Sequence, residues 1–209
     1  MSTVWFRNTT WNEAVERRFN EKLHRARRKE QYLRIQACTI ARSHPEVSLR
    51  LLNQYFELND DFEHAQAYVD QATALLALGR VNEAIESYNA ALAREAEFPK
   101  LQTQAYLDLP YLIATNGIRQ KYDHAIQLLE KYKARLTFPV ERFCWNAAYA
   151  LIAAETNDAA SAKMYAQSAL EAAALDHSGF RYHPTAGLVT GAYDDIVRKL
   201  KKYSVRHTP

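Results

Sequence analysis

The sequence predicts an all-α protein, and three observations lead to that fold class. Alanine occurs 33 times in 209 residues, whereas glycine occurs 5 times and proline 6 times, so residues that favour helices dominate. No run of β-branched residues alternates with polar ones, as a half-buried strand would require. Residues 72–92 read as two helices joined by a tight turn at Gly79, and this pattern recurs along the chain. A helix pair of this kind cannot bury its apolar faces alone, so it predicts a stacked array.

The recurring element is a helix in which small and large residues share one stripe. In the second helix of the 72–92 segment, Ala84 and Ala91 alternate with large apolar residues. Small residues let two helices approach closely, and large ones fill the grooves between them. The pattern occurs clearly in three segments and more weakly in a fourth, in which Ser48 takes the place of the small residue. These segments are Val81, Ala84, Ile85, Tyr88, Ala91 and Leu92; Tyr122, Ala125, Ile126, Leu129 and Tyr132; Ala159, Ala162, Ala166, Ala169 and Leu170; and, weakest, Pro45, Leu49, Leu52, Tyr55 and Phe56.

Each of these segments is expected to follow a first helix, and one further helix is expected at each end of the chain. The end helices would cover the exposed faces of the array. Thr10 and Glu13 have the spacing of a capping box, and Pro110 is expected to kink or split its helix. The expected first helices lie at about 27–43, 62–78, 101–116 and 140–155, and the end helices at about 10–26 and 190–203.

The repeated hairpin resembles a tetratricopeptide repeat, most specifically over 62–95 and more generally over 27–175. The resemblance implies a right-handed α-solenoid of about four such helical hairpins within a single domain spanning residues 1–209. The matching alanines Ala84, Ala125 and Ala162 lie 41 and 37 residues apart. Since the usual repeat is about 34 residues, longer helices or loops are expected here.

The same resemblance implies a binding groove, because the first helix of each pair in that family usually lines a concave surface for peptides or helices. The family's carboxylate-clamping Lys, Arg and Asn are absent from the matching positions, so a chaperone-tail clamp is not expected. The groove would be apolar and mildly acidic, and could hold an amphipathic helix, a basic peptide or the chain's own terminal helix. By position, the residues facing it would be Gln66, Val69, Asp70 and Thr73, and in a later unit Cys144, Ala147, Ala148 and Leu151.

A second candidate site is the segment 178–189, which follows the last repeat within an expected loop over 176–189. It contains two of the five glycines, and Arg181, Tyr182 and His183 stand together just before Pro184. Loops bounded by glycine and proline that carry such groups often serve binding. The alternative is a structural connector whose aromatic residues pack on the last repeat.

Catalytic and metal-binding patterns are missing from the sequence. There is no HExxH motif, no His/Cys set with metal-ligand spacing, no phosphate-cradling glycine loop and no nucleophile elbow. We therefore expect neither an enzyme nor a cofactor, although an enzyme centred on Arg181 and His183 remains an alternative. Cys38 and Cys144 are the only cysteines, and we expect both to be reduced core thiols.

The net charge of +3 is unevenly distributed, since residues 1–34 carry +5, residues 35–180 carry −6 and residues 181–209 carry +4. Basic ends could lie against the acidic middle or contact a separate partner. The leading hypothesis is a scaffold or adaptor that binds a protein or peptide. It would be cytoplasmic and a monomer or weak homodimer, with no membrane partner, because no apolar run reaches the roughly 20 residues of a span.

Two alternatives for the partner remain open. One is an immunity-type inhibitor whose acidic middle covers a basic toxin. The other is a regulator that contacts nucleic acid through a basic strip on the first helices, near Tyr32. Nucleic acid is the less favoured partner, because Glu13, Glu16, Glu21 and Glu30 interleave with the strip. The strip consists of Arg17, Arg18, Lys22, Arg25, Arg28 and Lys29.

Overall fold

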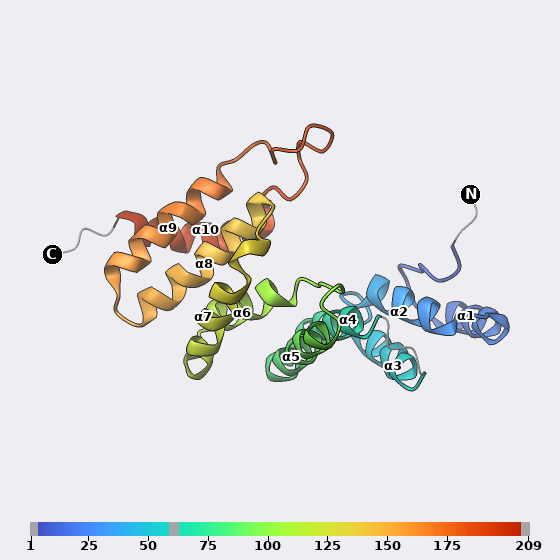
Figure 1. Ribbon diagram of the computed structural model, residues 1–209. Helices are drawn as coiled ribbons and strands as arrows, with labels where there is room; N and C mark the ends of the chain where they lie inside the picture. Colours follow the sequence, from blue (N-terminus) through green and yellow to red (C-terminus); the bar gives the residue numbers. More distant parts are fainter. Residues whose placement is uncertain (1–3, 59–62, 206–209) are drawn as a thin grey trace. The chain divides into compact units, whose positions relative to one another are not determined.

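The computed structural model describes residues 4–58 and 63–205. These residues form ten α-helices and three short 3-10 helices, with no strand among them, so the all-α prediction is confirmed for this part of the chain (Figure 1). The chain divides into two compact units, Met1–Ala105 and Tyr106–Pro209, each of which is described by itself. The single domain over 1–209 stays a prediction.

The first unit contains five helices that pack on their neighbours along the chain. α2 packs on α3, α3 on α4 and α4 on α5, and α2 also contacts α4. A buried cluster of Phe19, Leu33, Ala37, Ile40, Leu51, Leu52, Tyr55 and Ala67 joins the first four helices. The helices are α1 (Glu13–Arg25), α2 (Lys29–Ile40), α3 (Pro45–Phe56), α4 (His64–Ala77) and α5 (Val81–Glu97).

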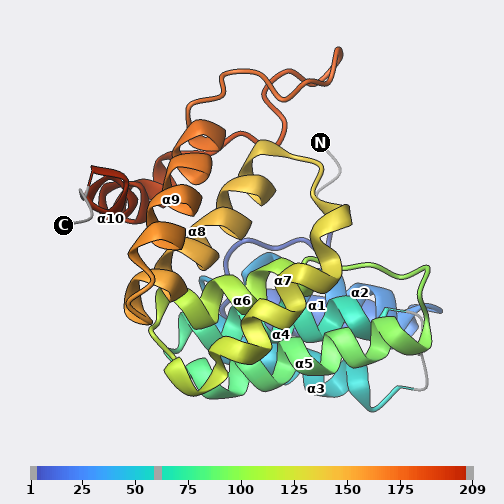
Figure 2. The same ribbon diagram turned by 60° about the vertical axis from the view of Figure 1, so that its left-hand side comes forward.

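The second unit repeats part of this packing scheme. α8 packs on α9, α9 on α10, and α8 also contacts α10, while α7 lies against α8; Figures 1 and 2 both show α8 and α9 side by side. Its helices are α6 (Ala105–Thr115, which begins at the last residue of the first unit), α7 (Tyr122–Tyr132), α8 (Pro139–Glu155), α9 (Ala159–Ala173) and α10 (Asp194–Val205). The 3-10 helices are η1 (Arg119–Lys121), η2 (Lys133–Arg135) and η3 (Gly191–Tyr193).

Three of the interhelical turns share the same backbone conformation and hydrogen bond. Gly79, Gly117 and Asn157 each have a positive φ, of 73°, 65° and 62°, in the left-handed region that ends a helix. The residue after each donates its N–H to a carbonyl five positions earlier, as in Arg80 to Leu75 at 2.9 Å. Asp158 then caps α9 by accepting from the Ser161 N–H at 3.0 Å.

The turns also explain the unequal spacing of the matching alanines. Ala84 and Ala162 follow their left-handed residues by five positions, whereas Ala125 follows Gly117 by eight. The three extra residues are those of η1, which precedes α7. Ala84, Ala91, Ala125 and Ala162 are all buried, as is Ser48, whose hydroxyl donates to the Ala37 carbonyl at 2.9 Å. The small-residue positions are therefore helix contacts.

Three local expectations were wrong in whole or in part. Asn12, not Thr10, caps α1, because its side chain accepts from the Val15 N–H at 3.0 Å while the backbone is extended. α6 continues through Pro110, so of the expected kink or split, the split is absent. Cys38 is exposed, whereas Cys144 is buried as expected, and both thiols are free.

Candidate functional site

Residues 178–184 form a loop closed by its own hydrogen bonds, called here the 178–184 loop. The N–H of Ser178 donates to the Pro184 carbonyl at 2.7 Å, and its hydroxyl donates to the His183 carbonyl at 2.6 Å. The same hydroxyl accepts from the Phe180 N–H at 3.1 Å. Ser178 is buried, and its three bonds hold both ends of the loop together.

The loop is also anchored to the start of α8. The ring of Phe180 packs on that of Phe138, with centroids 5.2 Å apart, and the Val140 N–H donates to the Gly187 carbonyl at 2.8 Å. A Cβ at Gly187 would lie 2.5 Å from the Cβ of Phe138, so this close approach needs glycine. The loop thus contacts the start of α8 through Phe180, and the chain just after the loop is held there at Gly187.

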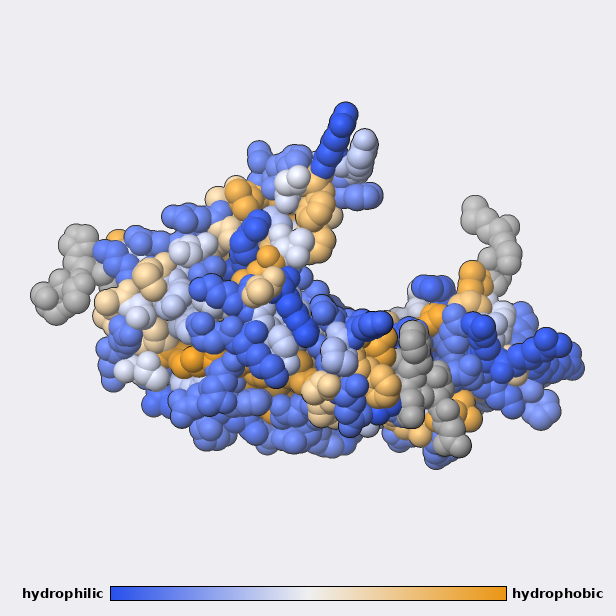
Figure 3. All heavy atoms as spheres, in the orientation of Figure 1, coloured by the Kyte–Doolittle hydropathy of each residue, from blue (hydrophilic) through white to orange (hydrophobic). Residues whose placement is uncertain are grey.

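The three side chains predicted as a site all point outward from this anchored backbone. Arg181, Tyr182 and His183 are exposed, and 79% of the Tyr182 surface is accessible. The Arg181 guanidinium lies over the Tyr182 ring, 5.4 Å from its centroid. Figures 1 and 2 show the segment projecting beyond α8 and α9, and Figure 3 shows hydrophilic side chains at its tip. The structure has a pocket beside α1, described below, and another on α3, α4 and α5. These three residues line neither of them.

The other predicted site residues, on α4, take part in bonds within the first unit. Asp70 is 4% exposed and accepts from Arg34 Nη1 at 3.1 Å and from Gln66 Nε2 at 3.2 Å. Arg34 also binds Glu63 through two bonds, of 2.6 and 3.2 Å. Thr73 is half-buried, and its hydroxyl donates to the Val69 carbonyl one turn earlier at 3.0 Å. The structure therefore brings Gln66 and Asp70 together as an internal cluster with α2.

The expected groove positions on α8 are closed as well. Cys144, Ala147, Ala148 and Leu151 are all buried. Tyr193, just before α10, packs its ring on Phe143 at 5.2 Å between centroids, and α10 contacts α8. The C-terminal part of the chain therefore reaches this helix at Cys144, whose thiol is hydrogen-bonded to Tyr193.

The two thiols are not poised as nucleophiles. Although Cys38 as a whole is exposed, desolvation of its sulfur by the surrounding protein raises its pKa to about 11, and its thiol also donates to the Asp70 carboxylate. Burial raises the pKa of Cys144 to about 12. Within residues 4–58 and 63–205, no group of three His, Cys, Asp or Glu side chains is placed to hold a metal ion.

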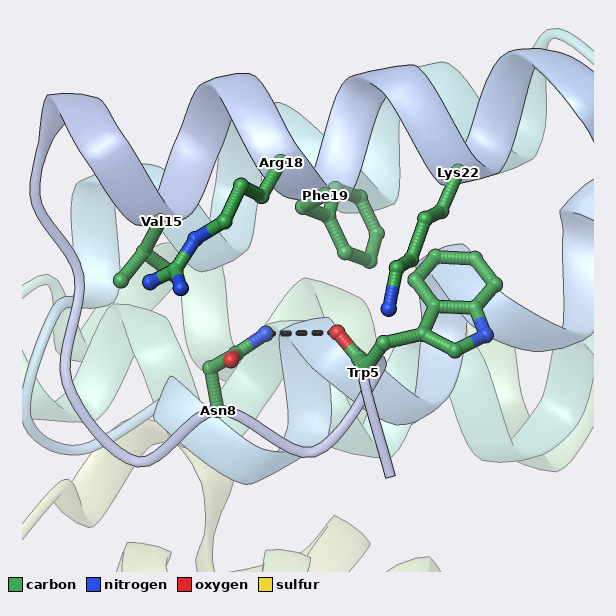
Figure 4. Close-up of a pocket in the computed structure, with 6 residues that line it drawn as sticks. All are labelled: Trp5, Asn8, Val15, Arg18, Phe19 and Lys22. Atoms are coloured by element: carbon green, nitrogen blue, oxygen red, sulfur yellow. Dashed lines mark hydrogen bonds between the residues drawn. The ribbon is translucent and has the colours of Figure 1, made fainter. Parts of the chain in front are cut away.

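A pocket of about 190 Å³ lies between α1 and the segment that precedes it, called here the N-terminal pocket. Its α1 wall has the spacing i, i+3, i+4 and i+7 of one helical stripe, with Val15, Arg18, Phe19 and Lys22. Trp5 and Asn8 form the opposite wall. Figure 4 shows Arg18 and Lys22 reaching from α1 toward that segment.

Sequence reasoning placed Arg18 and Lys22 in the basic strip but did not find this pocket. The i, i+3, i+4, i+7 spacing was available as a signal, whereas the return of Trp5 and Asn8 beside α1 depends on a contact with α2 that no local pattern encodes. Tyr32, near the basic strip, packs its ring on Trp5 at 4.8 Å and on Phe6 at 4.7 Å between centroids.

No family model matches the chain, and neither a curated protein nor a solved structure matches it. No helix in the described part of the chain has the length and apolar character needed to cross a bilayer.

Proposed function

We propose that the chain is a non-catalytic interaction protein, a tetratricopeptide-like α-solenoid that binds a protein partner with the 178–184 loop. Two observations support the repeat architecture. In each unit a helix contacts both of the next two helices, α2 with α3 and α4, and α8 with α9 and α10. The left-handed turns at Gly79, Gly117 and Asn157 recur with the same hydrogen bond, as expected of stacked repeats.

The observation that carries the binding role is the exposed Arg181–Tyr182 pair on an anchored backbone. Tyrosine and arginine are enriched among the residues that dominate protein interfaces. A loop already held in one conformation loses less entropy when it binds, and the bonds of Ser178 supply that order. A connector would need the anchoring bonds, but it would not need an aromatic ring that is 79% exposed.

The first experiment places a photo-crosslinking amino acid at position 182 of the full chain in its native cells. The matched control carries the same group at Met164, an exposed apolar residue of α9 in the same unit. We expect a protein to be captured from position 182 and not from position 164. Equal capture from both positions, or none from 182, contradicts the proposal.

The second experiment measures the affinity of the purified partner for single variants. Tyr182→Ala and Arg181→Ala are each expected to weaken binding by about tenfold or more, the effect of losing an interface anchor. Met164→Ala should leave the affinity unchanged. All three variants should keep the parent's unfolding midpoint, since these side chains are exposed. If the partner binds Tyr182→Ala as tightly as the parent, the loop is only a connector.

A further inference from the structure

The N-terminal pocket has a preformed wall. Asn8 and Gln36 exchange three hydrogen bonds: Gln36 Oε1 accepts from the Asn8 N–H at 2.9 Å and from Nδ2 at 2.8 Å, and Gln36 Nε2 donates to the Asn8 carbonyl at 2.8 Å. Gln36 is fully buried in α2. Asn8 Nδ2 also donates to the Trp5 carbonyl at 2.7 Å, as Figure 4 shows. The segment opposite α1 is therefore fixed before any ligand binds.

The apolar part of the pocket is fixed as well. The Trp5 ring packs on Phe19, with centroids 5.4 Å apart, and on Tyr32. Phe19 is 1% exposed and belongs to the core of the unit. This part of the pocket suits a short carbon stem.

The polar part of the pocket is cationic. Arg18 donates its Nε–H to the Ala14 carbonyl at 3.3 Å, within its own helix, which leaves the terminal guanidinium nitrogens for another acceptor. Among the residues that the structure describes, neither Arg18 nor Lys22 forms an ion pair, and no carboxylate lines the pocket. Glu16, two residues before Arg18 in α1, is already bound to Arg50 at 2.7 Å and to Trp11 at 3.0 Å.

We propose that the N-terminal pocket binds a phosphate monoester. Two cations match the charge of about −1.5 to −2 that such a group carries near pH 7. The guanidinium fork of Arg18 suits two phosphate oxygens, and Lys22 supplies a second, mobile donor. A volume of about 190 Å³ lies below the roughly 300–1,000 Å³ of pockets for larger ligands, so it fits a phosphoryl group with a short stem.

The test is calorimetric titration of the full chain with O-phosphoserine, inorganic phosphate and unmodified serine. The parent should bind the first two and not the third. Tighter binding of O-phosphoserine than of inorganic phosphate supports a phosphate monoester, whereas tighter binding of inorganic phosphate overturns the proposal. If neither O-phosphoserine nor inorganic phosphate binds, the proposal is wrong.

Variants separate the pocket from general charge attraction. The double variant Arg18→Gln, Lys22→Gln should bind O-phosphoserine about tenfold or more weakly than the parent, because charge-assisted bonds are lost. The matched control is the double variant Arg17→Gln, Arg27→Gln, which removes the same charge from exposed positions outside the pocket. It should change the affinity for O-phosphoserine by less than about twofold in physiological salt. Equal losses in the two variants overturn the proposal.

Two further measurements test the role of the Arg18 fork and the choice between a phosphate monoester and a diester. Arg18→Lys keeps the charge but loses the planar fork, so its affinity should fall between those of the parent and the double variant.

A single-stranded oligonucleotide without terminal phosphate offers only diesters. If Arg18→Gln, Lys22→Gln lowers oligonucleotide binding by a larger factor than O-phosphoserine binding, the pocket is part of a nucleic-acid surface and the proposal is wrong.

Discussion

The polar residues of α4 and those of the 178–184 loop differ in what they are bonded to. On α4, Asp70 is held by Arg34 and Gln66 and is almost inaccessible to a partner. In the loop, the backbone and Ser178 form the internal bonds, and Arg181 and Tyr182 stay exposed. Both regions look like binding surfaces in the sequence, but only the second presents its polar side chains to solvent.

The difference has a simple physical origin. A carboxylate on the inner face of a helix must find a partner when a neighbouring helix covers it, because an unpaired buried charge is costly. α2 covers this part of α4 and supplies Arg34. Within residues 4–58 and 63–205, no helix covers the tip of the loop, where Arg181, Tyr182 and His183 are exposed, so these side chains have no such requirement.

The largest effect on stability is expected when Arg34, the cation beside Asp70, is removed. Arg34→Ala leaves the Asp70 carboxylate buried without its cation, and we expect a loss of about 3–5 kcal/mol in the free energy of unfolding. Asp70→Ala should cost less, about 1–3 kcal/mol, because Arg34 keeps its two bonds to Glu63. Chemical denaturation of both variants measures this asymmetry.

Arg34→Lys is the control for charge alone. An ammonium cannot reproduce the fork that binds Glu63 and reaches Asp70 at once, so its stability should lie between those of the parent and Arg34→Ala. Equal stability of Arg34→Ala and the parent would show that Asp70 is solvated, and the α4 face would again be a candidate surface.

A second prediction concerns the small residues that let the helices approach. Ala84 and Ala91 are fully buried, so Ala84→Leu or Ala91→Leu should overpack the contact and cost about 1–3 kcal/mol. Ala93, which is exposed on the same helix, is the matched control, and Ala93→Leu should leave the unfolding midpoint nearly unchanged. A similar midpoint in all three variants would contradict the helix register.

The small-residue stripe was predictable because it is a local periodicity, and Ala84, Ala125 and Ala162 all proved to be buried. The turn at Gly79 was predictable for the same reason, since glycine readily adopts a positive φ. The left-handed Asn157 and the η1 insertion before α7 have weaker local signals. The partners of Asp70 and the return of Trp5 beside α1 depend on residues about 30 positions away along the chain, which no local pattern specifies.

A third prediction extends the comparison to Glu155, a partly buried and hydrogen-bonded residue of the second unit. It accepts from the Tyr122 hydroxyl at 2.6 Å and from Arg119 Nε at 3.2 Å, and the hydrogen bond from Tyr122 is the main cause of its lowered pKa. A carboxylate with a lowered folded-state pKa adds stability above its unfolded pKa of about 4.3, and this stability is lost as the pH falls.

The parent should therefore lose stability relative to Glu155→Gln as the pH is lowered from about 5 to 3, because the lowered pKa of Glu155 makes the folded state lose its carboxylate charge over this range. Glutamine can accept the Tyr122 bond but does not titrate, so it isolates the charge. Unfolding free energies of the two proteins at several pH values give the difference, and a parallel pH dependence would show that the Glu155 charge adds no stability.

The smallest effect on stability is expected at the tip of the 178–184 loop, and it completes the comparison. Tyr182→Ala should change the free energy of unfolding by less than about 0.5 kcal/mol, because the ring is largely exposed. Ser178→Ala removes one acceptor and one donor that hold the loop, so the Phe180 and His183 amides should exchange hydrogen faster. Global stability should fall by only about 1 kcal/mol. If Tyr182→Ala instead speeds exchange as much as Ser178→Ala, the ring is part of what orders the loop, and its exposure no longer marks it as a side chain available to a partner.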